Sequence, residues 1–179
     1  MIGMLLALVV LAAVFLGIRQ YNKNIASATS TTEDTQETVL DVNSDDITSF
    51  RYVYEGETYA FEKKDETWYY TDDHSLNLNQ DRIKAMILKV APLKADQVIE
   101  NVTDMSQYGL ANPERTIQYE TADRSVIINV GNLNSMTSQY YIAFPSEMKV
   151  YVVATNVVTG FNYTLDDLVM TEYVNREGR

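Results

Sequence analysis

The stretch MSQYGLANPERTIQYE, residues 105–120, places a helix stop directly before an alternating strand pattern. Asp104 can cap a single helical turn at the start of this stretch, and Gly109 can adopt the left-handed conformation that ends such a turn. Leu110 would then fold back onto the turn. Pro113 prevents the helix from resuming and favours extended backbone. The stretch therefore predicts one short helical turn that leads into a strand.

Upstream of this stretch, the sequence from Ile47 predicts a three-stranded antiparallel meander. Aromatic residues recur at alternate positions, and polar turns at residues 55–57 and 63–66 interrupt the pattern twice. The third strand carries Trp68-Tyr69-Tyr70. Aromatic enrichment favours strand over helix throughout this part of the chain.

The hydrophobic period changes after residue 79. Apolar side chains at positions 83, 86, 87 and 90 have the spacing of one helix face. Asn79 is the expected N-cap, and Pro92 is expected to close the segment after Ala91. The residues that follow, LKADQVIE at 93–100, are predicted to form one further strand.

Downstream of residue 115 the sequence predicts a second β region followed by small helices. The expected strands cover residues 116–120, 125–130, 139–144 and 149–153, and the expected helices cover residues 156–161 and 165–170. Strands grouped apart from helices predict an α+β fold, in which helices pack on an antiparallel sheet. Both halves of the chain run from hairpins into a helical segment, which suggests an internal duplication.

Residues 1–18 carry no charged side chain and predict a single-pass transmembrane helix. A helix of this length reaches about 27 Å, close to the thickness of the hydrocarbon core of a bilayer. Residues 19–38, rich in Ser and Thr, are predicted to form a juxtamembrane segment and flexible stalk, and residues 39–175 the soluble α+β domain. The alternative is a cleaved signal peptide, for which Ala26-Ser27-Ala28 resembles a cleavage site.

The side of the membrane on which the domain lies is a separate question. The only cations near the span follow it, and the positive-inside rule taken literally would place the domain in the cytoplasm. We nevertheless expect an extracytoplasmic domain on a cell-membrane anchor.

Composition narrows the classes of function. The net charge of −11 repels phosphate backbones, so no nucleic-acid partner is expected. The chain has no Cys, which excludes disulfides, thiol nucleophiles and Cys-bound metals. No phosphate-binding loop or dinucleotide fingerprint occurs, and no cofactor or metal is expected.

Few side chains in the sequence invite a catalytic or binding hypothesis. The only His, His74, follows Asp72 and Asp73, and the three could bind a cation. The alternative is a polar turn, in which Asp and Ser are ordinary residues. The pairs at 45–46 and 166–167 are expected to lie at the starts of strands or helices.

The chain holds 13 Tyr against 5 Phe, so its sheet is expected to present aromatic surface with polar tips. Tyr140 and Tyr141 form the candidate interaction face on this reading. Packing within the core is the alternative. Replacing both with Ser would separate the two interpretations.

In their order along the chain, several marks resemble an extracytoplasmic family called domain of unknown function 4340. The marks are Trp68, Tyr108, Gly109, Leu110, Pro113, Ile128, Val130-Gly131, Tyr140-Tyr141 and Val150-Tyr151-Val152-Val153. The resemblance implies an N-terminal membrane anchor, no assigned catalytic residues, and frequent encoding beside transport systems of the gliding-associated or ABC permease type. It implies tandem domain copies in longer members, a feature this short chain does not share.

Two hypotheses of function follow. The first is a membrane-anchored, non-catalytic accessory or interaction protein that contacts a transporter permease or another envelope component. The alternative is an envelope ligand-binding module or hydrolase that uses the region of Asp72, Asp73 and His74.

Overall fold

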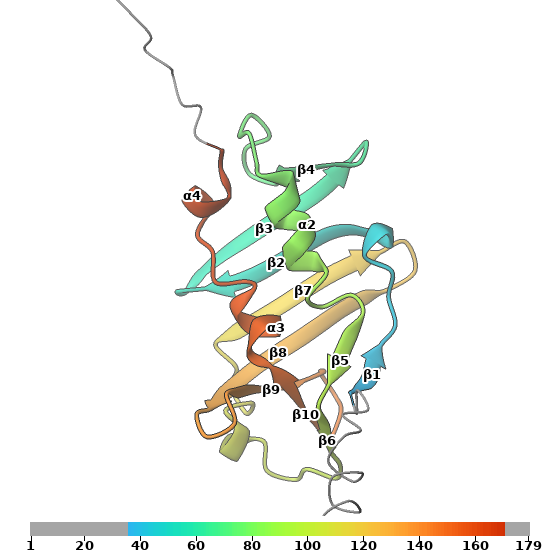
Figure 1. Cartoon of the computed structure of the whole chain (residues 1–179), viewed down its shortest axis with the longest axis vertical. Coiled ribbons are helices and arrows are strands. Elements are labelled where there is room, and N and C mark those ends of the chain that lie inside the picture. The colour runs from blue at the N-terminus through green and yellow to red at the C-terminus, as the bar shows by residue number, and fades with distance from the viewer. Residues whose placement is uncertain (1–35, 171–179) are drawn as a thin grey trace, which may run out of the picture. The chain divides into compact units, whose positions relative to one another are not determined.

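A computed structural model describes residues 36–170 of the chain (Figure 1). The predicted anchor at residues 1–18, most of the predicted stalk and the last residues of the predicted domain lie outside this range. Between residues 36 and 170, no helix combines the length and apolar character needed to cross a bilayer.

In the described part of the chain, ten strands build two antiparallel sheets. Their bounds are β1 Glu37–Leu40, β2 Ile47–Tyr54, β3 Glu57–Lys64, β4 Thr67–Tyr70, β5 Leu93–Ala95, β6 Gln97–Ile99, β7 Arg115–Thr121, β8 Ser125–Asn134, β9 Gln139–Ala143 and β10 Val150–Ala154. Eight of the strands form one sheet in the order β4-β3-β2-β7-β8-β9-β10-β6, and β1 pairs with β5 in a second, two-stranded sheet. β2 and β7, which are distant in sequence, are neighbours at the centre of the large sheet.

Between residues 36 and 170 the helices are few and short. They are α2 Gln80–Ile87, α3 Thr155–Thr159 and α4 Leu165–Leu168, with 3₁₀ turns at Ser44–Asp46 and Ser106–Tyr108. Figure 1 shows α2, α3 and the β1–β5 pair lying across one face of the large sheet. The main hydrophobic cluster fills the space between this layer and the sheet. The prediction of an antiparallel sheet with helices packed on it is confirmed for the described residues.

The predicted meander is confirmed as β2, β3 and β4. Its inward-facing side chains are aromatic and buried, and they stack across the strands. The rings of Phe50 and Phe61 are stacked with centroids 4.7 Å apart, and Trp68 meets Phe50 edge-on at 5.1 Å. The alternation of the sequence therefore corresponds to a buried aromatic face and a solvent-exposed polar face.

Helix α2 begins where the sequence predicts. The side chain of its N-cap, Asn79, accepts a hydrogen bond from the Arg82 backbone N–H, and Ile83, Met86 and Ile87 are buried. The helix ends at Ile87, earlier than the apolar spacing suggests. Val90 is nevertheless buried in the turn that follows.

The segment at residues 93–100 differs from its prediction as one strand. It forms β5, which pairs with β1, and β6, which pairs with β10 in the large sheet. Asp96 separates the two strands. Its carboxylate accepts hydrogen bonds from the amide nitrogens of Gln36 and Gln139 at 2.6 and 2.7 Å. This network holds the chain at the point where it passes from one sheet to the other.

The helix stop at Gly109 is confirmed. Gly109 has a φ of 73°, and the Leu110 N–H donates to the Met105 carbonyl oxygen at 3.0 Å, which closes the turn as a Schellman motif. The Asp104 carboxylate accepts the Ser106 N–H at 2.9 Å. The helical part is a single 3₁₀ turn, and β7 begins shortly after Pro113.

This turn lies on the opposite face of the large sheet from α2 and α3. Tyr141 packs beneath it, whereas its neighbour Ile142 lies in the main cluster, and successive strand residues point to opposite faces. The buried members of this second cluster are Val102, Leu110, Ala143 and Val150. The segment before β7 therefore covers one end of the sheet and builds a small core there.

Candidate functional site

A hollow lies in the large sheet beside the first residues of β8. It measures about 440 Å³ and is lined by Val39, Leu40, Arg124, Ser125, Val126, Ile127, Phe144, Pro145, Glu147 and Tyr151. We refer to this hollow as the β8 notch. Its volume lies within the range of pockets that hold small ligands or a few side chains of a partner.

The notch exists because two neighbouring strands differ in length. β8 has 10 residues and β9 has 5. The last ladder pair between them is Asn129 with Ala143. The residues before Asn129, from Ser125 to Ile128, pair with β7 on one side and with no described strand on the other.

The backbone groups that face the notch follow from the turn between β7 and β8. The Thr121 N–H donates to the Arg124 carbonyl oxygen at 2.9 Å, so Arg124 directs its polar groups to β7. In an antiparallel ladder these directions alternate along the strand. Ser125 and Ile127 therefore direct their N–H and C=O groups away from β7 and into the notch.

The floor of the notch is apolar. Phe144 and Tyr151 meet edge-to-face with ring centroids 5.3 Å apart, and Val126 is buried beside them. β1 contributes two consecutive residues, Val39 and Leu40, because its register with β5 shifts between Thr38 and Leu40. Such a bulge re-aims a side chain that would otherwise point to the opposite face.

One end of the notch is acidic. The Tyr151 hydroxyl donates to the Glu147 carboxylate at 2.7 Å. Burial raises the pKa of Tyr151, as do this hydrogen bond and the negative charges of Glu100 and Glu37. Lys149 lies 2.9 Å from Glu100, and that contact raises the pKa of Lys149. Three carboxylates therefore act on this end, and Lys149 is held by one of them.

The side chains of Asp72, Asp73 and His74 have separate neighbours. The Asp73 carboxylate accepts the Ser75 N–H at 2.9 Å, while His74 Nε2 lies 2.7 Å from a Glu62 oxygen. Asp72 interacts with Tyr70 instead. In the described part of the chain, no group of three His, Asp or Glu side chains is placed to hold a metal ion.

The two residues of the candidate interaction face are not brought together. Tyr140 packs against the main cluster on one face of β9, and Tyr141 packs against the second cluster on the other face. The Tyr141 hydroxyl accepts a hydrogen bond from Asn134 Nδ2 at 3.0 Å, and its ring lies edge-on to Tyr108 at 5.0 Å. Their role in binding stays a prediction, but they cannot contribute to one common surface.

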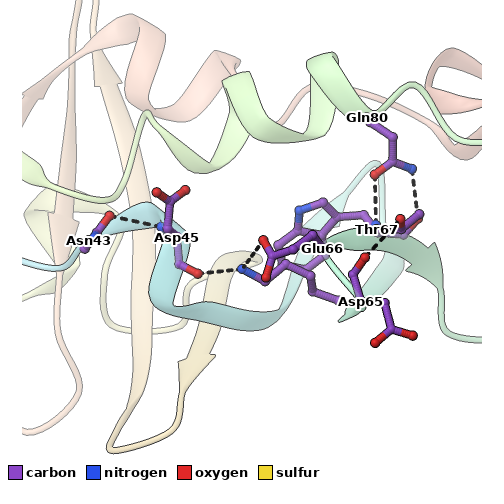
Figure 2. Close-up of polar contacts among 8 residues, drawn as sticks. Asn43, Asp45, Asp65, Glu66, Thr67 and Gln80 are labelled. Carbon is purple, nitrogen blue, oxygen red and sulfur yellow. Dashed lines mark hydrogen bonds and ion pairs between the residues drawn. The ribbon is translucent and has the colours of Figure 1, made fainter.

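Trp68 is buried at the start of β4, where Gln80 of α2 clamps its backbone. The Trp68 N–H donates to Gln80 Oε1 at 2.8 Å, and Gln80 Nε2 donates to the Trp68 carbonyl at 3.0 Å (Figure 2). Nearby, Lys63 Nζ donates to the Asp45 carbonyl oxygen at 2.5 Å and lies 3.9 Å from Glu66. A hollow of about 210 Å³ opens beside these residues. The ammonium group of Lys63, which lines it, is already bound by the oxygens of Asp45 and Glu66.

Tyr108, Gly109 and Leu110 have a packing role. A Cβ on Gly131 of β8 would overlap the Tyr108 carbonyl oxygen and come within 2.9 Å of Leu110 Cγ. A Cβ on Gly109 would in turn overlap the Asn132 side chain. The turn and β8 are therefore in direct backbone contact, which only glycine permits at these two positions.

Reasoning from sequence did not find the β8 notch. One signal was available, because Pro145 follows the predicted strand at 139–144 and lacks the N–H needed to continue a ladder. The contributions of Val39, Leu40 and Glu147 had no local signal, since they meet β8 only through the fold.

No curated protein and no solved structure matches the chain. A family model does match it, over residues 68–177, and this span includes α2, the turn at Gly109, β8 and the residues of the notch from Arg124 onward. The chain belongs to the family described as Domain of unknown function (DUF4340).

Proposed function

We propose that this protein is a single-pass membrane protein whose α+β domain lies outside the cytoplasm and docks another protein. The docking is non-catalytic, and the partner is a transporter permease, of the ABC type for example, or another component of the cell envelope. The membrane part of the proposal rests on residues 1–18, an uncharged apolar run of spanning length.

The observation that carries the docking role is the β8 notch. It joins an apolar floor to backbone N–H and C=O groups of Ser125 and Ile127 that no described strand pairs with. Ile127, which lines the notch, is 37% exposed, and Met148, next to Glu147 in sequence, is 65% exposed. Exposed strand edges and apolar surface are both common features of docking sites.

The competing hypothesis is an envelope hydrolase or ligand-binding module at Asp72, Asp73 and His74. Its three side chains have separate neighbours, which does not favour a shared ligand. Thermal unfolding with added calcium or zinc tests this hypothesis directly. A rise of several degrees that disappears in the His74→Ala variant would support it against the docking role.

Position-specific crosslinking in intact cells tests the docking role. A photo-reactive phenylalanine analogue replaces Ile127 in the full chain, and a matched control variant carries it at Asp81, an exposed residue of α2. After illumination, membranes are solubilised in detergent and crosslinked products identified. We expect one product from position 127 that contains an integral membrane or envelope protein and is absent from position 81.

The membrane part of the proposal has its own test. Carbonate extraction of membranes should leave the full chain in the pellet, and protease added to intact cells should cleave the domain. Recovery of the chain in the supernatant, or full protection of the domain, would refute the anchor or the orientation respectively. Identical crosslinked products from positions 127 and 81 would refute docking at the notch.

A further inference from the structure

We propose that the β8 notch takes one extended segment of the partner, which adds as a strand to the free edge of β8 and carries an apolar side chain beside a Lys or Arg. This inference rests on the proposed docking role and specifies its mode. It concerns residues Ser125 to Ile128, a stretch that would match about four residues of a partner strand.

Backbone pairing is the first reason. Ser125 and Ile127 direct N–H and C=O groups into the notch, and the described strands leave both unpaired. An exposed edge of this kind is a template for another strand, and strand addition is a recurrent mode of peptide recognition. From Asn129 onward, β9 pairs with this same edge of β8. An added strand would therefore extend the sheet in line with β9.

Side-chain chemistry is the second reason. In an added strand, alternate side chains would point to the core side of the sheet, where Val126, Phe144 and Tyr151 form the apolar floor. The hollow of about 440 Å³ has room for an aliphatic side chain there.

Charge is the third reason, and it selects the flanking residues. Glu147 lines one end of the notch, where its carboxylate accepts a hydrogen bond from the Tyr151 hydroxyl at 2.7 Å, within a chain of net charge −11. A Lys or Arg beside the apolar residue would meet this potential, while Asp or Glu would be repelled. Arg124 lines the notch on the side of the β7–β8 turn, where an acidic residue of the segment could be accommodated.

The test uses the full chain in detergent micelles and peptides of defined sequence. The probe is acetyl-Lys-Val-Thr-Val-Ser-amide, and its acidic counterpart has Glu in place of the Lys. Binding is followed by NMR at the amides of Ser125 and Ile127. We expect the basic probe to shift both amides and the acidic probe to bind about tenfold more weakly, with the difference shrinking at high salt.

N-methylation distinguishes strand addition from other contact modes. Two versions of the basic probe are methylated, one on the central Thr nitrogen and one on both Val nitrogens. Because only alternate N–H groups of an added strand face its neighbour, one version should lose binding and the other should keep it. Equal binding by both versions would overturn strand addition.

A variant of the protein provides a second check. Ile127→Pro removes an N–H that faces the notch and not β7, so the β7 ladder is retained, and proline is tolerated on a free edge. It should abolish probe binding, whereas the control Ile127→Val should bind as the unchanged chain does. If Ile127→Pro does not fold, the methylated probes still decide the matter.

Two other occupants of the notch are outcomes of the same experiment. If the Ser125 and Ile127 amides are protected from exchange without any probe, the notch is filled by residues 1–35 of the chain or by a second copy, and the inference is overturned. A position-127 crosslink to a partner, combined with equal binding of both methylated probes, would refute strand addition while leaving the docking role in place. Absence of that crosslink would refute the docking role itself.

Discussion

Replacing Gly131 with Ala tests whether the turn at Gly109 is packed on β8 as described. The added methyl group would overlap the Tyr108 carbonyl oxygen and lie 2.9 Å from Leu110 Cγ and 3.2 Å from Leu110 Cδ2. The first of these atoms belongs to the backbone of a closed Schellman turn, so it cannot rotate away as a flexible side chain could. The turn must move outward, or β8 must bend.

The magnitude follows from two opposing effects. Overpacking of a well-packed site costs about 1–3 kcal/mol. Alanine in place of glycine within a strand stabilises the folded state by about 0.5–1 kcal/mol, because it reduces the entropy of the unfolded chain. The cost has an upper limit, because the turn can detach completely and expose Leu110, at about 3 kcal/mol. We therefore expect the free energy of unfolding to fall by about 1 kcal/mol.

Two measurements separate global unfolding from local detachment of the turn. Trp68 is the single Trp of the chain and lies in the main cluster, so its fluorescence in a urea titration reports global unfolding. Hydrogen exchange at the Leu110 amide reports the bond to the Met105 carbonyl. The described contact would be refuted if the free energy of unfolding of the Gly131→Ala variant lay within about 0.5 kcal/mol of that of the unchanged chain and the Leu110 amide were equally protected from exchange.

Three further predictions concern the rest of the domain. Gln80→Ala should lower the free energy of unfolding by about 2 kcal/mol, because both backbone groups of Trp68 lose their partner, and urea titration measures this loss. Hydrogen bonds from the N-cap residue of α4 lower the pKa of Asp167; its stabilising contribution is therefore complete above the ordinary value of 3.8 and disappears as the pH falls through the lower folded-state pKa. Stability measured against pH should consequently fall less steeply in acid for Asp167→Ala than for the unchanged chain. Tyr140→Ser and Tyr141→Ser should each cost about 2 kcal/mol in thermal unfolding, since each ring packs against a hydrophobic cluster, whereas an unchanged melting temperature for either would assign that ring to an interface.

Local physical rules explain why much of the fold could be read from the sequence. The meander, the N-cap at Asn79 and the stop at Gly109 each depend on residues a few positions apart. The same is true of α4, where Thr164 and Asp167 form a capping box at the predicted helix start. The acidic pair at 45–46 likewise lies in the first turn of a 3₁₀ helix, as predicted.

Features that depend on distant pairing could not be read in this way. Residues 93–100 look like one strand because Leu93, Ala95, Val98 and Ile99 are all apolar or small, and nothing local shows that Asp96 is held by Gln36 and Gln139. The pairing of Tyr140 with Tyr141 as one face is a different case. The strand prediction already implied opposite faces for two consecutive residues, so the period-2 rule alone argues against it.

The family motif residues at the turn around Gly109 cover one end of the large sheet, and this covering segment is connected to the notch. The turn at Gly109 packs on Gly131 and shares the second cluster with Ala143 and Val150, the residues that end β9 and begin β10. The same covering segment is tied to the β9–β10 connection, because the Val102 N–H donates to the Met148 carbonyl oxygen at 2.9 Å. That connection forms one wall of the notch. The glycine contact is thus linked, through the covering segment, to one wall of the notch where we propose that a partner strand enters.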